Sequence, residues 1–110
     1  MVEDFLSDCR GITIRKGHIR ERHFRNVSPT NSYFTIKPSL LFAVVYRVLL
    51  LRLVPNDYRR EHDNKMIVWV DLGYPIGLYR KWNVMTSRFA IVLTKSDGWA
   101  TVKTCYPDGV

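Results

Sequence analysis

The segment Lys16-Gly17-His18-Ile19-Arg20-Glu21-Arg22-His23 combines two imidazoles with three cationic side chains, Lys16, Arg20 and Arg22. Imidazole titrates near neutral pH and exchanges protons with reacting groups. Arg and Lys side chains stabilise the negative charge that develops on a phosphate during its reaction. RNA carries its own nucleophile, the 2′-hydroxyl, so these residue types suffice for metal-free acid–base cleavage of RNA.

The two imidazoles of this segment do not share a helix face. His18 and His23 are five residues apart, which is about 140° around a helix axis. His18 and Arg22, four residues apart, do share a face. We therefore expect one of the two His residues to act on the substrate and the other to pack or orient.

Other common chemistries lack their sequence patterns. The chain has no paired Cys motif, no His-x-x-x-His, no carboxylate cluster, no phosphate-binding Gly loop and no Gly-x-Ser-x-Gly elbow. Metal and nucleotide cofactors depend on such patterns. We therefore expect no metal and no cofactor. Cys105 is interpreted as a small core residue, and a bridge between Cys9 and Cys105 stays open.

The charge distribution favours an anionic partner. The chain has 110 residues and a net charge of +7, of which residues 10–25 contribute +5. Such an excess is typical of proteins that bind nucleic acid, an anionic membrane or an acidic protein. The apolar run 40–53 contains Arg47 and Arg52 and is shorter than the roughly 20 residues that span a bilayer, so no membrane anchor is expected.

The pattern of apolar and turn residues predicts an α+β fold, with N-terminal helices packed on a C-terminal antiparallel sheet. Ser39 is the expected N-cap of the third helix, Asp97-Gly98 the expected hairpin turn, and Trp69 an expected core residue. Helices are predicted at 4–10, 17–24 and 40–53, an exposed polar connection at 58–65, and strands at 66–70, 76–79, 87–94 and 99–106.

Several short motifs resemble a known family when they are read in order. They are Gly17-His18-x-x-x-Arg22-His23, Ser32-Tyr33-Phe34, Gly77, and Thr104-Cys105-Tyr106-Pro107 after the Asp-Gly hairpin. Together they resemble the ribonuclease A-like C-terminal toxin domain of bacterial contact-dependent inhibition and related polymorphic toxin systems. The chain departs from that pattern in its shorter middle and in having one Gly, rather than two, before His18.

The resemblance implies a ribonuclease A-like fold over a single toxin domain, residues 1–110, and metal-independent cleavage of RNA, with tRNA as one candidate. It implies secretion within a larger effector, delivery to the cytoplasm of target bacteria, and neutralisation by a cognate acidic immunity protein. The free domain is expected to be a monomer. Carried over by position, His18, His23, Thr104 and Tyr106 become the candidate catalytic residues. The candidate phosphate-binding residues are Lys16, Arg20, Arg22, Arg25 and Lys81.

Three alternatives stay open. Toxins of the barnase, EndoU and colicin type also join N-terminal helices to a C-terminal sheet, with a different strand order. A basic RNA-binding module without catalysis would use the same charged surface, including the basic-aromatic patch Tyr79-Arg80-Lys81-Trp82. A small basic protein that docks on an acidic neighbour is the third.

Overall fold

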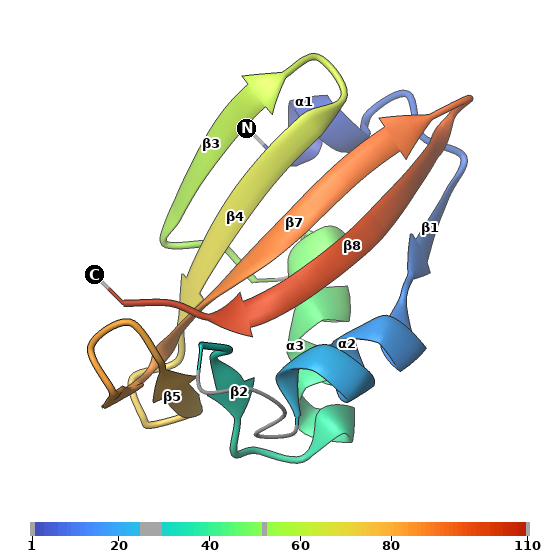
Figure 1. Cartoon of the computed structure of the whole chain (residues 1–110). Coiled ribbons are helices and arrows are strands. Elements are labelled where there is room, and N and C mark those ends of the chain that lie inside the picture. Colours follow the sequence, from blue (N-terminus) through green and yellow to red (C-terminus); the bar gives the residue numbers. More distant parts are fainter. Residues whose placement is uncertain (1, 25–29, 52, 110) are drawn as a thin grey trace.

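A twisted sheet with helices against one face forms the body of the protein (Figure 1). The computed structural model describes residues 2–24, 30–51 and 53–109. Its elements, in chain order, are α1 (Val2–Leu6), β1 (Gly11–Ile14), α2 (Lys16–His23), β2 (Tyr33–Phe34), α3 (Pro38–Leu49), β3 (Asp57–His62), β4 (Lys65–Asp71), β5 (Gly77–Tyr79), β6 (Val84–Thr86), β7 (Arg88–Ser96) and β8 (Trp99–Pro107). The α+β class predicted from the sequence is confirmed at this level.

The described strands form two sheets. The larger has the order β1-β8-β7-β4-β3 and the smaller the order β2-β5-β6. The central β7–β8 hairpin turns at Asp97 and Gly98, which both have positive φ, as the Asp-Gly pair predicted. The C-terminal strands β4, β7 and β8 pair antiparallel, as predicted. The N-terminal strand β1, which was not predicted, pairs with β8 in parallel, so the larger sheet is mixed.

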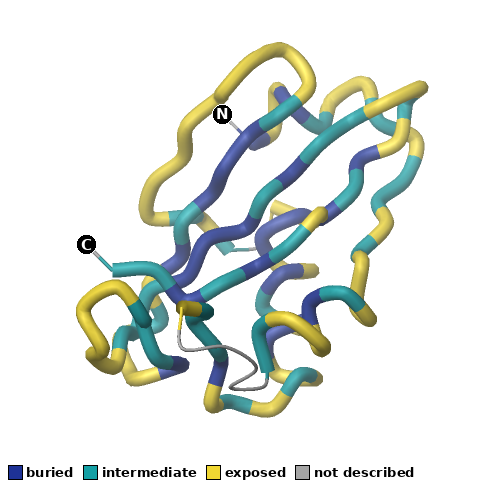
Figure 2. The backbone as a smooth tube through the Cα atoms, viewed as in Figure 1, coloured by how far each residue is buried: buried dark blue, intermediate teal, exposed yellow. Residues whose placement is uncertain are grey.

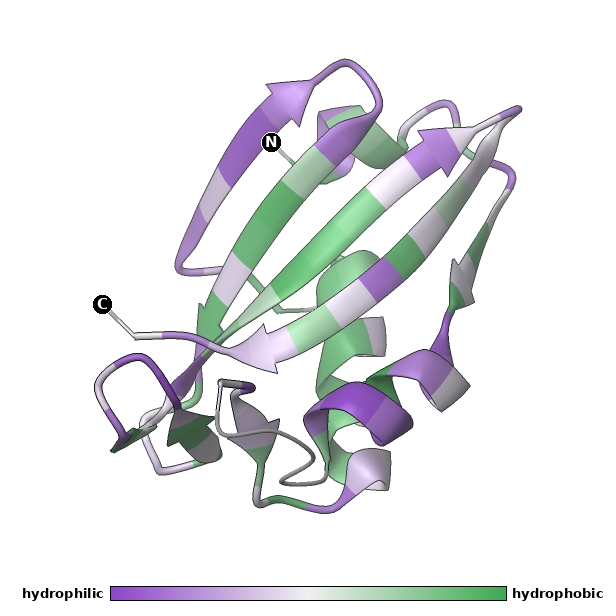
Figure 3. Cartoon of the chain, in the orientation of Figure 1, coloured by the Kyte–Doolittle hydropathy of each residue, from purple (hydrophilic) through white to green (hydrophobic). Residues whose placement is uncertain are grey.

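The core lies between the larger sheet and α3. Alternate residues of β4 and β7 are buried on one face, and α3 buries the stripe Leu41, Phe42, Val45, Val48 and Leu49. This stripe repeats with helical period, so one side of α3 packs on the sheet. Figures 2 and 3 show the buried and apolar segments following this interface.

The ends of α3 differ from the prediction. Lys37 is the N-cap and Pro38 occupies the first turn, whereas Ser39 lies inside the helix. Proline suits that position because its missing N–H would be unpaired there in any case. The helix ends at Leu49, and Leu51 has a positive φ of 60°. The predicted helix over 40–53 is therefore too long at its C-terminal end. None of the helices in the described ranges is long and apolar enough to cross a membrane.

The predicted polar connection at 58–65 is wrong, because most of this segment is the edge strand β3. All six of its residues are exposed, and it pairs antiparallel with β4 (Figure 2). Charged side chains are common on sheet edges, where they oppose pairing with other chains. A run of exposed charge therefore does not distinguish an edge strand from a loop.

Trp69 is also placed differently from the prediction. It pairs across the sheet with Asp57 and Ala90, on the face opposite the core residues Val68 and Val70. There it is half-buried, and its Nε1 donates to Oδ2 of Asp108 at 2.8 Å. The strand alternation that buries Val68 and Val70 directs Trp69 to the other face.

Gly77 holds the smaller sheet close to the end of β8, and we expect Gly77→Ala to destabilise the protein by about 1–3 kcal/mol. A Cβ atom at this position would lie 2.6 Å from Cγ of Pro107 and 2.6 Å from the backbone oxygen of Tyr33. Denaturant unfolding measures the change. Gly17→Ala is the matched control: a Cβ there meets no atom within 4 Å, so the helix should gain roughly 0.5–1 kcal/mol. Equal stabilities of the two variants would contradict the close packing at Gly77.

Candidate active site

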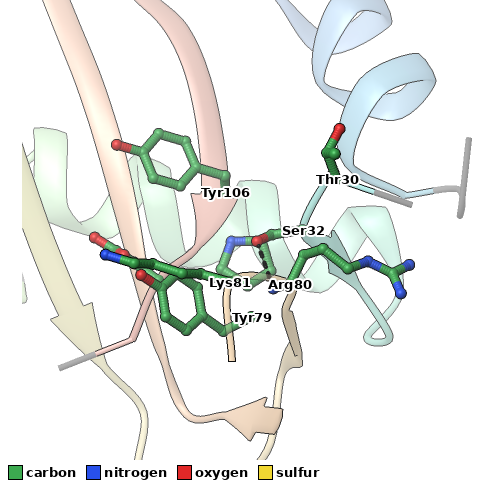
Figure 4. A pocket seen from close by; sticks show the side chains of 8 residues that line it. Thr30, Ser32, Tyr79, Arg80, Lys81 and Tyr106 are labelled. Carbon is green, nitrogen blue, oxygen red and sulfur yellow. Dashed lines mark hydrogen bonds between the residues drawn. The ribbon is translucent and has the colours of Figure 1, made fainter. Parts of the chain in front are cut away.

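A pocket of about 470 Å³ opens where the end of β8 meets β5 and the residues before β2 (Figure 4). Both tyrosines in its lining come from strand ends, and two basic residues follow β5 directly. The lining consists of Thr30, Ser32, Tyr79, Arg80, Lys81, Tyr106, Pro107 and Asp108. It therefore brings hydroxyl, cationic and carboxylate groups into one concave surface.

Short contacts hold the pocket wall together. The hydroxyl of Ser32 accepts a hydrogen bond from the backbone N–H of Arg80 at 3.0 Å, and Nε of Arg80 donates to the carbonyl of Asn31 at 3.2 Å. β2 pairs with β5 at Tyr33 and Leu78. Hydrogen bonds and strand pairing thus hold residues 31–33 beside residues 78–80, which are far away in the sequence.

α2 delivers His23 to the edge of this pocket. His23 is not one of the lining residues, but it contacts two of them, Ser32 and Tyr106. Ile19 anchors the helix in the core, and the backbone N–H of Arg15 donates to the carbonyl of Val102 in β8 at 3.2 Å. Phe24, which follows the helix, packs on Phe34 with ring centroids 5.1 Å apart. The last residue of the helix therefore lies beside β8 and the residues that precede β2.

His23 has a defined hydrogen-bond partner. Its Nδ1 lies 3.1 Å from the carbonyl oxygen of Ser32. A carbonyl oxygen only accepts, so Nδ1 carries the proton and the neutral ring keeps its lone pair on Nε2. This tautomer is the one that a general base at Nε2 requires.

The environment of His23 favours the neutral ring. Burial lowers the pKa of His23 below its usual 6.5, and the charges of His18 and Arg22 act in the same direction, while the hydrogen bond to Ser32 opposes them. Removing a charged imidazole from water costs free energy, so the uncharged form gains. At neutral pH the ring is ready to accept a proton.

Tyr106 lies next to His23, with ring centroids 6.0 Å apart and planes tilted by 44°. Burial raises the pKa of Tyr106 above its usual 10, and the nearby carboxylate of Asp108 raises it further. The phenol therefore keeps its proton across the neutral range. Adjacent groups whose pKa values move in opposite directions are suited to act as base and acid.

Lys81 and Arg80 differ in how they meet the pocket. In Figure 4 the side chain of Lys81 extends to the same side as those of Tyr79 and Tyr106, whereas that of Arg80 extends to the opposite side. The guanidinium of Arg80 lies 5.4 Å from the ring centroid of Tyr33. Lys81 is thus the cation on the same side as Tyr106. Arg80 holds the pocket wall together through its hydrogen bonds with Ser32 and Asn31.

Thr104 lies on the same face of β8 as Tyr106, opposite Val92 in the neighbouring strand. It does not belong to the pocket lining. Its Oγ1 is buried and has no hydrogen-bond partner among the described residues. Of the two hydroxyls predicted on this strand, the structure therefore places only that of Tyr106 at the pocket.

The basic residues of α2 spread over several surfaces. Nζ of Lys16 lies 5.7 Å from the ring centroid of Phe42, and the guanidinium carbon of Arg20 lies 5.8 Å from the same centroid. These two side chains therefore cover α3 rather than the pocket. Arg22 is exposed, and its charge lowers the pKa values of His18 and His23. Arg25 lies outside the described residues.

His18 does not contribute to the pocket lining. Desolvation lowers its pKa, and the charges of Arg15 and Arg22 lower it further. Of the two imidazoles of α2, His23 is the one that contacts the pocket residues Ser32 and Tyr106. Of the predicted catalytic and phosphate-binding residues, the structure groups His23, Tyr106 and Lys81.

Four further residues of the pocket were not predicted as catalytic or phosphate-binding residues: Ser32, Tyr79, Arg80 and Asp108. Ser32 stands in a short motif, but its carbonyl partnership with His23 has no sequence signal. Tyr79 and Arg80 lie in the basic-aromatic patch, which is the signal that could have placed them here. Asp108 follows the last strand and has no pattern of its own.

The two cysteines are free thiols, and Cys105 is buried in the core. Burial raises the pKa of Cys105, so its thiol stays protonated. Among the described residues no group of three or more His, Cys, Asp or Glu side chains is arranged to hold a metal ion. Comparison of the chain with protein-family models, with curated proteins and with solved structures found no significant match.

Proposed function

We propose that this protein is a metal-independent ribonuclease that uses His23 and Tyr106 as its base and acid. The observation that carries the proposal is their contact, at 6.0 Å between ring centroids, at the edge of a pocket that Tyr106 and Lys81 line. A half-buried imidazole with a lone pair on Nε2 and a protonated phenol supply the two proton transfers that RNA cleavage needs. The net charge of +7 supports a polyanionic substrate.

In the proposed reaction, Nε2 of His23 takes the proton of the 2′-hydroxyl and the 2′-oxygen attacks the adjacent phosphorus. The bond from phosphorus to the 5′-oxygen breaks, and Tyr106 protonates the departing oxygen. Lys81 stabilises the additional negative charge on the phosphoryl oxygens. The products are a 2′,3′-cyclic phosphate end and a 5′-hydroxyl end, and exchange with water returns both side chains to their starting forms.

The resemblance of the sequence motifs to a toxin family suggests the biological role of this activity. We propose that the domain is a ribonuclease A-like toxin of bacterial competition, released into target cells from a larger effector and neutralised by an acidic partner. The barnase, EndoU and colicin type of fold is the alternative with similar chemistry. A noncatalytic RNA-binding module is the alternative of another class, favoured by the basic-aromatic wall of the pocket alone.

Cleavage of RNA in excess EDTA is the test. We expect single-stranded RNA to be cut to products that end in a 2′,3′-cyclic phosphate, because the nucleophile belongs to the substrate. RNA with a 2′-O-methyl group at the cleavage position, and DNA of the same sequence, should remain intact. Binding without cleavage would favour the noncatalytic module, and loss of cleavage on chelation would exclude the proposed mechanism.

A further inference from the structure

The turn that follows β5 presents an aromatic ring directly beside the pocket. Trp82 is 56% exposed although it is one of the largest apolar side chains of the protein. Tyr79 lies against it, with ring centroids 5.4 Å apart and planes nearly perpendicular. Three residues that precede it in the chain, 79–81, line the pocket. A ligand that fills the pocket therefore lies close to the ring of Trp82.

This turn is held in one conformation. Asn83 has φ 53°, and its backbone N–H donates to the carbonyl of Arg80 at 3.2 Å. Arg80 is fixed in turn through Ser32 and Asn31. The position of Trp82 relative to the pocket is therefore set by a closed turn, and little conformational entropy is lost when a ligand stacks on the ring.

The charge beside the ring favours a polyanion over an apolar protein surface. Arg80 and Lys81 directly precede Trp82, and the pocket lining holds these two cations and one carboxylate, that of Asp108. Exposed aromatic rings interleaved with cations are the combination that binds single-stranded nucleic acid, since the ring stacks on a base and the cations neutralise phosphates. In a duplex the base faces are already stacked on one another, so only an unpaired base reaches such a ring.

We propose that Trp82 is the stacking platform for an unpaired RNA base adjacent to the phosphate held in the pocket. This inference rests on the proposed function, and it specifies the substrate class as single-stranded RNA or an RNA loop. Lys81 immediately precedes Trp82 in the chain. It neutralises the phosphate that links the nucleotide stacked on Trp82 to the next nucleotide.

Binding of a short single-stranded RNA with 2′-O-methyl groups throughout tests the platform without cleavage. We expect Trp82→Ala to weaken binding by about 5- to 100-fold, the range that stacking on one aromatic ring supports. Trp82→Phe should restore part of the affinity, since it keeps an aromatic face. Trp99→Ala is the control, because Trp99 is 50% exposed but lies at the opposite end of β8 from Tyr106.

A hairpin of the same 2′-O-methyl RNA, with all bases paired except a loop, and a fully paired duplex complete the experiment. Trp82→Ala should weaken binding of the loop and leave the weaker, charge-driven duplex binding unchanged. Unchanged affinity for the single strand, or equal losses for strand and duplex, would overturn the platform. Trp82→Ala that binds RNA normally but no longer binds an acidic protein inhibitor would assign the ring to a protein interface instead.

The two proposals fail separately in this design. If the parent protein binds the single strand through Trp82 but cuts no unmodified RNA, the ribonuclease is excluded and the platform stands. If cleavage occurs and Trp82→Ala changes neither binding nor KM, the platform is excluded and the ribonuclease stands.

Discussion

Replacing His23 by Gln is expected to lower kcat/KM for RNA cleavage by about 10²- to 10⁴-fold, the usual contribution of a general base. Gln cannot accept a proton at neutral pH, whereas His23 keeps a lone pair on Nε2 because its Nδ1 donates to Ser32. Initial rates on a defined oligoribonucleotide, measured for the two purified proteins, give the ratio directly.

The pH dependence identifies the group that acts as base. Burial lowers the pKa of His23, so the neutral ring that accepts a proton predominates from below pH 6.5 upward. In the parent protein kcat/KM should therefore rise with pH through a midpoint below 6.5 and then level off as the neutral ring comes to predominate. This acidic limb should be absent from the residual activity of His23→Gln.

Two further His variants complete the comparison. His62→Gln, on the exposed edge strand, should cleave at the parental rate. His18→Gln changes an imidazole of the same helix that lies about 140° around the helix axis from His23, so it should affect cleavage far less than His23→Gln. A greater loss in His18→Gln than in His23→Gln would reverse the assignment of the base.

Local signals account for the parts of the fold that the sequence predicted correctly. The β7–β8 turn needs positive φ at two successive residues, and Asp97-Gly98 supplies the residue types that tolerate it. Four of the strands, β4, β5, β7 and β8, and the helix α3 follow from their content of apolar and β-branched residues. These features depend on neighbouring residues, so no knowledge of tertiary contacts was needed to place them. The sequence placed apolar residues on almost every face of this helix, whereas the structure buries one stripe and leaves Leu40 and Tyr46 exposed.

The features that were missed depend on distant partners. β1 forms because Gly11–Ile14 lies beside Trp99–Val102 in parallel, and no local pattern reports a pairing over such a separation. β3 is a strand because it can pair with β4, although its residues are polar and exposed. Here pairing at the sheet edge outweighs composition.

In the candidate site, too, some features were predicted from the sequence and others depend on contacts between distant residues. Residue types predicted the imidazoles, the family resemblance added the phenol of Tyr106 and the basic-aromatic patch the ammonium of Lys81, and the structure brings His23, Tyr106 and Lys81 to one region. Choosing His23 over His18 required the direction of α2, which Ile19 and the contact with β8 determine. Lys16 and Arg20 have the right charge, but the packing of α2 on α3 places them over Phe42.

Replacing Tyr106 by Phe is expected to lower kcat for RNA by about 10²-fold or more, because the departing 5′-oxygen then lacks its proton donor. Phe keeps the ring that contacts His23, so the fold and the position of the base should be retained. Tyr46→Phe, on α3, removes a hydroxyl away from the pocket and should leave kcat unchanged.

A substrate whose leaving group needs no proton separates the role of the acid from that of the base. On a nucleoside 3′-(4-nitrophenyl phosphate), the departing nitrophenolate is stable as an anion, so Tyr106→Phe should cleave it at nearly the parental rate. His23→Gln should be impaired on both substrates, since the 2′-hydroxyl must lose its proton in each. An equal loss of Tyr106→Phe on both substrates would show that Tyr106 positions the phosphate or the base rather than donating the proton, because only a proton donor becomes dispensable when the leaving group improves.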